Sequence, residues 1–224
     1  MDQPQLVAPS HGQVVDEAKT AAPSRDAADL AKSAEREKWR ASLREANQHV
    51  WLHGPHGSGD NLDASLKRNS AFIKRLKQTN LADAKDALVK EVQLLSLTKY
   101  LDELIPSIPE ILWKATTLKD RYAAIEILCA LHARFGGSEF TEPLLKVMEQ
   151  EIVPPPPKSQ DASNEQAQKE AALVARQRSL LRGVTEMVLV GLVGPMTQSE
   201  GVCAPGLNWL YEQLRKMLSQ DRDL

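Results

Sequence analysis

The chain has 224 residues, of which 42% are hydrophobic and 26% charged, a balance typical of a globular protein of one or two domains. Only 4% are aromatic, so the core has to be built from Leu, Ile, Val and Ala, which favours packed helices over a sheet. The formal net charge of −2 excludes attraction of nucleic acid by the overall field, and only a local basic patch could supply it.

The N-terminal segment, residues 1–28, is rich in Pro, Ala, Ser, Asp and Gln and has no apolar periodicity, so we expect it to be disordered. It lacks the basic start and apolar block of a signal peptide. The apolar run GVTEMVLVGLVGPM contains Glu186 and is too short to span a bilayer. Cys129 and Cys203 are too few for a disulfide framework. These features predict a reduced intracellular protein.

Helical periodicity starts near Asp29 and stops at the breakers GPHGSGDN after His53. The next helix, about 61–79, carries Leu62, Leu66, Ile73 and Leu76 on one face, with Asn69 filling the missing apolar position. Further helices are predicted over LADAKDALVKEVQLL, over SLTKYLDELIPSIPEILWK with a break at Pro106 and Pro109, over LKDRYAAIEILCALHARF ending at Gly136 and Gly137, and over SEFTEPLLKVMEQEI capped by Ser138 or Thr141.

A polar, Pro-rich linker is predicted at 153–165, followed by a helix over about 166–193 whose apolar second half should be central to the core. The last helix, about 205–219, has an amphipathic stripe, and residues 220–224 form a tail. Residues 29–219 are thus an all-α domain of about eight helices. Their spacing predicts an α-solenoid of antiparallel helix pairs of the HEAT or armadillo kind, with a globular helix bundle as the alternative.

The feature most suggestive of a ligand is the polar face of the helix at 61–79. Its cations are not interrupted by an acid between Asp63 and Asp83: Lys67, Arg68, Lys74, Arg75 and Lys77. The pattern is that of any amphipathic surface helix, but a structural surface normally mixes acids with its bases. This face is our candidate surface for RNA or for a protein partner, with Lys85 and Lys90 added if the next helix lies alongside.

Other candidate chemistry fits a structural role better. His49, His53 and His56 have the spacing of metal ligands only in part, because His56 lies among glycines and no fourth ligand follows, so no metal site is predicted. Glu186 should be partly buried, and it should pair with an arginine or cap a neighbouring helix rather than act as a general acid. The tryptophans should pack between helices. No nucleophile or acid–base signature is present, so we predict neither an enzyme nor a cofactor.

Four segments in order resemble a known family: LDASLKRNSAFIKRLK, LSLTKYLDELIPSI, AAIEILCALHARF and GLNWLYEQLRKML. They are similar to the first helical-repeat domain of the up-frameshift scaffold proteins of nonsense-mediated mRNA decay, a domain of the class named after the middle domain of eukaryotic initiation factor 4G. The resemblance covers about residues 35–219. The basic stretch Leu62–Lys77 is its most specific part, and TEMVLVGLV followed by YEQL is a second anchor.

This resemblance implies an α-solenoid without catalytic activity that assembles other decay factors. It also implies a location in the cytoplasm, the perinuclear region included. Because the family strings several such domains together, we expect the repeat domain to be incomplete at its C-terminal end and the last helix to expose apolar surface. The family's best-defined partner contacts belong to segments outside this chain, so the resemblance transfers no binding residue to it.

Overall fold

The structure, a computed structural model, describes residues 25–57, 62–78, 80–153, 164–194 and 205–222. The chain divides into two units, residues 1–36 and 37–224, each considered by itself. In the first unit the described part is the beginning of helix α1, which starts at Arg25, four residues before the predicted start at Asp29. The rest of the predicted disordered segment lies outside the described residues, as do most of the linker and Cys203.

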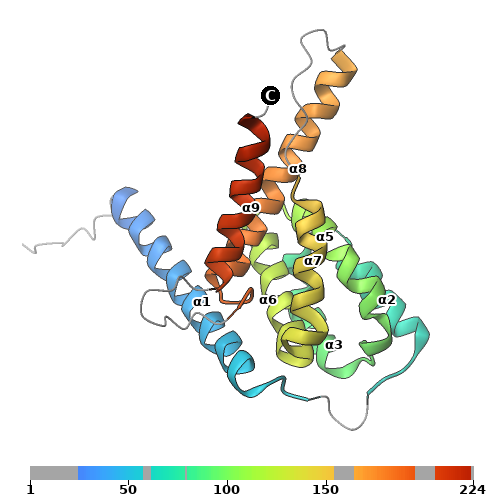
Figure 1. Cartoon of the computed structure of the whole chain (residues 1–224). Helices are drawn as coiled ribbons and strands as arrows, with labels where there is room; N and C mark the ends of the chain where they lie inside the picture. Colours follow the sequence, from blue (N-terminus) through green and yellow to red (C-terminus); the bar gives the residue numbers. More distant parts are fainter. Residues whose placement is uncertain (1–24, 58–61, 79, 154–163, 195–204, 223–224) are drawn as a thin grey trace, which may run out of the picture. The chain divides into compact units, whose positions relative to one another are not determined.

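The described residues are almost entirely helical, as predicted (Figure 1). Within them, β structure amounts to one isolated bridge between Asp63 and Leu95. The α-helices are α1 (Arg25–His53), α2 (Leu66–Leu76), α3 (Leu81–Leu94), α4 (Leu101–Leu104), α5 (Ile108–Lys114), α6 (Leu118–Gly136), α7 (Glu142–Glu151), α8 (Asn164–Leu189) and α9 (Pro205–Arg222).

The predicted break at the two prolines is confirmed. The segment runs as a 3₁₀ turn (Thr98–Tyr100), α4, a second 3₁₀ turn (Ile105–Ser107) and α5, so Pro106 and Pro109 each stand in the first turn of a new element. Gly136 ends α6 as predicted, with φ of 77°. Of the two cap residues predicted for α7, Thr141 is at the N-cap position, but it makes no capping bond with its side chain: a π-helical turn (Gly137–Thr141) leads into this helix, and the Thr141 hydroxyl lies 2.7 Å from the His132 ring.

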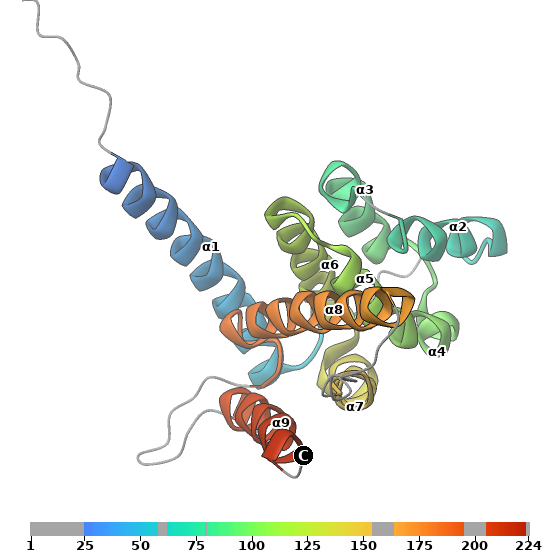
Figure 2. The same cartoon turned by 90° about the horizontal axis from the view of Figure 1, so that it is seen from above.

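The segment from Thr98 to Lys114 can be counted as one broken helix. With this count, each helix in the middle of the second unit packs on the helix two places further along the chain. Helix α3 packs on α6 and α6 on α8, while α5 packs on α7 and also on α8. Seen from above, α8 crosses the middle of this unit, with α7 and α9 on one side and α3 and α6 on the other (Figure 2). Stacked layers of this kind are the arrangement of an α-solenoid, as predicted.

The second half of α8 lies in the core, as predicted, with Leu180, Val184 and Met187 fully buried. Cys129 is also buried as predicted, beside α1. The basic helix differs in detail. Because α2 begins only at Leu66, Leu62 is not part of it and Leu66 is exposed at its first turn, while the sequence reading missed the fully buried Phe72.

Several helices end on carbonyl groups that accept hydrogen bonds from side chains of other helices. Arg134 of α6 donates to the carbonyl of Val92 near the end of α3. Gln177 of α8 donates to the carbonyl of Glu151, the last residue of α7, at 2.9 Å. The last four carbonyls of a helix have no partner within it. These contacts therefore satisfy helix ends and fix neighbouring repeats to one another.

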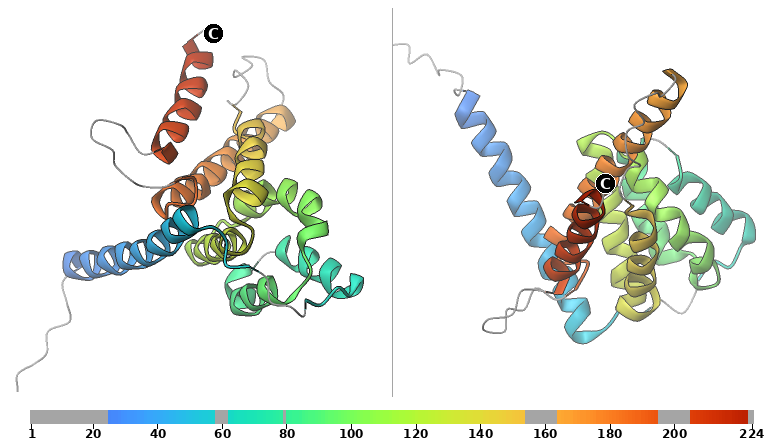
Figure 3. Two further views of the ribbon diagram at one scale, coloured as in Figure 1. Left: turned by 60° about the horizontal axis from the view of Figure 1, so that its bottom comes forward. Right: turned by 45° about the horizontal axis from the view of Figure 1, so that its top comes forward.

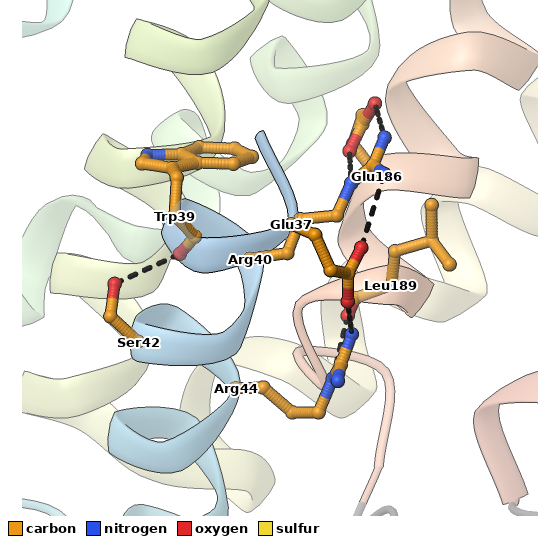
Figure 4. A network of polar contacts seen from close by, with 7 residues as sticks. All are labelled: Glu37, Trp39, Arg40, Ser42, Arg44, Glu186 and Leu189. Atoms are coloured by element: carbon orange, nitrogen blue, oxygen red, sulfur yellow. Dashed lines mark hydrogen bonds and ion pairs between the residues drawn. The ribbon is translucent and has the colours of Figure 1, made fainter. Parts of the chain in front are cut away.

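The end of α8 is held in the same way by the part of α1 that belongs to the second unit (Figures 3 and 4). Arg40 forms a two-bond ion pair with Glu186, with N–O distances of 2.9 and 2.7 Å, which confirms the predicted pairing of this acid with an arginine. In successive turns of α1, three donors then bond successive carbonyls: Arg44 to Leu189 at 3.0 Å, Asn47 to Val190 at 2.8 Å, and Trp51 to Gly191 at 3.1 Å. We call this set of contacts the α1 clamp.

Candidate partner-binding face

Helix α2 presents one buried and one solvent-facing side. Asn69, Phe72, Ile73 and Leu76 form the buried side, so the predicted place of Asn69 on the apolar face is confirmed. The Asn69 amide donates to the carbonyls of Asp63 at 3.2 Å and Ser65 at 2.9 Å, which explains how a polar side chain occupies that position.

The five cations of the sequence-derived candidate surface lie outside this buried side. Lys67, Arg68 and Lys74 are exposed, and Arg75 and Lys77 are half-buried. Between Lys67 and Lys74, the outward positions hold the small residues Ser70 and Ala71. The outward face of α2 is therefore low in its middle, where the side chains are small, and positively charged at both ends.

Two acids pair with the arginines of this face, one from just before α2 and one from α3. Arg68 pairs with Asp63, and Arg75 pairs with Glu91 of α3. The backbone N–H of Ser65, together with the Arg68 guanidinium, lowers the pKa of Asp63 below its usual value. The two arginines are thus partly neutralised, and the single sign of charge in the sequence is not the sign of the whole surface.

The lysines of this face differ from the arginines. Lys67 and Lys74 form no ion pair with any residue in the described part of the chain. Lys77 lies towards α5, where Lys114 donates to Glu110 at 2.6 Å and, with a smaller contribution from Lys77, lowers the pKa of that carboxyl. Of the two lysines expected to extend the face, Lys85 instead pairs with Glu126 at 2.7 Å, whereas Lys90 is exposed.

The histidine run has an arrangement that the sequence could not show. The ring of His49 stacks on those of His53 and His56, with centroid distances of 4.3 and 5.5 Å. Over the residues that the structure describes, no group of three or more His, Cys, Asp or Glu side chains is placed to hold a metal ion. The His53 ring also lies 3.1 Å from the His49 carbonyl, and the His56 backbone N–H donates to the Ala133 carbonyl at 2.8 Å, which holds the loop.

A shallow depression beside α5 is lined in part by Gln78, Asn80, Lys114 and Asp120. The Asp120 carboxylate accepts bonds from the Thr117 hydroxyl at 2.6 Å and from a backbone N–H of α3 at 3.1 Å. The Asp120 carboxylate therefore holds the start of α6 against α3. None of the described helices is long and apolar enough to cross a membrane.

The comparisons with individual proteins and with solved structures agree with one another. No protein-family model matches the chain. It is 39% identical over 132 residues to the nonsense-mediated mRNA decay protein 2 of Saccharomyces cerevisiae, covering 58% of this chain and 12% of the relative. It is 31% identical over 192 residues to the regulator of nonsense transcripts 2 of mouse, covering 84% of this chain and 13% of the relative.

A solved structure, that of the N-terminal mIF4G domain of S. cerevisiae Upf2, a protein involved in the degradation of mRNAs containing premature stop codons, superposes with a TM-score of 0.62 and 28% identity. The match covers 81% of this chain and 60% of the solved one. The fold and the matches define a helical-repeat domain of the mIF4G class. The chain is a homologue of nonsense-mediated mRNA decay protein 2 and of regulator of nonsense transcripts 2, and it spans about an eighth of their length.

Proposed function

We propose that this chain is a non-enzymatic scaffold module of nonsense-mediated mRNA decay, which assembles other decay factors in the cytoplasm, the perinuclear region included. The observation that carries the proposal is the 192-residue match to a regulator of nonsense transcripts 2, supported by the mIF4G fold of the same residues. Stacked helices offer long rigid surfaces, and such surfaces are the means by which solenoid proteins bind partners.

The surface that we propose for a partner is the outward face of α2, with Lys67, Arg68, Lys74, Arg75 and Lys77. Its support is the combination of exposed lysines, which form no ion pair with the described residues, and arginines held in place by Asp63 and Glu91. A positive, ordered face attracts a negatively charged partner and sets its orientation. No cofactor and no small-molecule substrate enters this function.

The test is an affinity purification of the chain from extract of its own cells, with and without nuclease. We expect decay factors to co-purify after nuclease treatment, and to be lost when Lys67 and Lys74 are changed to Glu. The matched control changes Lys99 and Lys119, which are exposed lysines outside α2, to Glu.

RNA binding through the same face is the alternative function. It predicts that partners are recovered only without nuclease and that affinity for RNA falls steeply with salt. That result, with RNA affinity lost in the α2 variant alone, would replace the scaffold proposal by an RNA-binding one.

A further inference from the structure

The partner face continues onto two exposed leucines where α2 begins and α3 ends. Leu66 is 68% exposed and Leu94 is 55% exposed. The segment just before α2 lies against the end of α3, because the backbone N–H of Asp63 donates to the Leu94 carbonyl at 2.8 Å, and that of Ser96 donates to the Asp63 carbonyl at 2.9 Å. A single exposed leucine needs no explanation, but two at one junction beside a charged face are typical of a protein-binding surface.

Positive charge borders both leucines. Lys90 lies one helical turn before Leu94 on the same face of α3, and Lys67 follows Leu66 on α2, about 100° further round the helix; both lysines are exposed. Lys90, like Lys67, forms no ion pair with the part of the chain that is described. Together with Lys74, these residues define the α2–α3 junction surface: Leu66, Lys67, Lys74, Lys90 and Leu94.

This surface fits a protein segment better than RNA. Proteins that bind single strands stack bases on exposed aromatic rings, but the four tryptophans are half-buried and engaged elsewhere. The indole N–H groups of Trp39 and Trp209 donate to Glu126 and Glu149, and that of Trp51 donates to the Gly191 carbonyl. Trp113 lies beside Lys114 and Arg176.

We infer that the α2–α3 junction surface binds an acidic segment of a protein partner that carries leucine-like apolar anchors. Its carboxylates would meet Lys67, Lys74 and Lys90, and its apolar side chains would cover Leu66 and Leu94. The small Ser70 and Ala71 leave room for the backbone of the segment between the lysines. The inference rests on the proposed function and adds the chemistry of the partner to it.

The inference is tested with the full chain and labelled probes in fluorescence anisotropy. The probes are a short acidic peptide with leucines four residues apart, the same peptide with serines for leucines, and a uridine-rich RNA of equal length. We expect the leucine peptide to bind at least about tenfold more tightly than the serine peptide, as expected for burying an apolar anchor. It should also bind more tightly than the RNA.

Two variants locate the binding. Changing Leu66 and Leu94 to Ser should weaken the leucine peptide by about tenfold or more, whereas Leu118→Ser, at a residue 47% exposed on α6, should leave it unchanged. Equal binding of all three probes, equal effects of the two variants, or no peptide binding at all would overturn the inference. None of these results bears on whether the chain supports mRNA decay, which is measured separately in cells.

Discussion

At the scale of single residues, His132 shows how burial shifts the pKa of a side chain. The ring is fully buried, one nitrogen lies 2.7 Å from the Thr141 hydroxyl, and the other has no partner within the described residues. Burial lowers the pKa of His132 from its ordinary 6.5 to about 4. Between these two values the unfolded chain binds a proton that the folded chain does not, so the free energy of unfolding falls as the pH is lowered through this range.

We therefore expect the chain to lose about 2 kcal/mol of stability between pH 7 and pH 5 through this residue. Equilibrium unfolding in urea at both pH values, compared for the natural chain and His132→Gln, isolates the effect because every other titrating group is shared. The same pH dependence in both proteins would show that His132 does not carry it.

At the scale of helices, the α1 clamp predicts a different kind of sensitivity. Asn47 is almost fully buried, and its side-chain amide donates a hydrogen bond to the Val190 carbonyl. Asn47→Leu keeps the number and branching of the side-chain heavy atoms but leaves that carbonyl unpaired, so we expect a loss of about 1–3 kcal/mol in the free energy of unfolding. Hydrogen exchange should also become faster at the end of α8. The control is Glu45→Gln, on an exposed position of the same helix, and equal stability of the two variants would contradict the role of the clamp.

Helices were the most predictable level of this protein, because hydrophobic periodicity and the prolines and glycines that stop a helix are local. Even the break at Pro106 and Pro109 follows from the ring chemistry of proline. The contacts that join the helices were not predictable. Glu186 was expected to meet an arginine, but its partner Arg40 lies 146 positions away, and no local pattern names it.

The candidate face shows the same limit. Its lysines and arginines were visible in the sequence, and so was its buried opposite side. Asp63 was part of the same stretch, but Glu91 became a neighbour of Arg75 only through the packing of α2 on α3. The exposure of Leu66 was missed because the helix starts later than its periodicity suggests. Ends of elements and long-range charge pairs are decided by tertiary structure.

At the scale of the whole molecule, the central claim is that this helical-repeat module serves nonsense-mediated mRNA decay through a surface on α2 and α3. The most direct measurement replaces the matching segment of S. cerevisiae nonsense-mediated mRNA decay protein 2 by this chain and follows the half-life of an mRNA with a premature stop codon. The same mRNA without that codon is the reference. A second chimera carries Lys67→Glu and Lys74→Glu, and a third carries Lys99→Glu and Lys119→Glu. We predict rapid decay of the premature-stop mRNA with the first and third chimeras and stabilisation with the second. A stable premature-stop mRNA with the first chimera, at normal protein level, would contradict the claim.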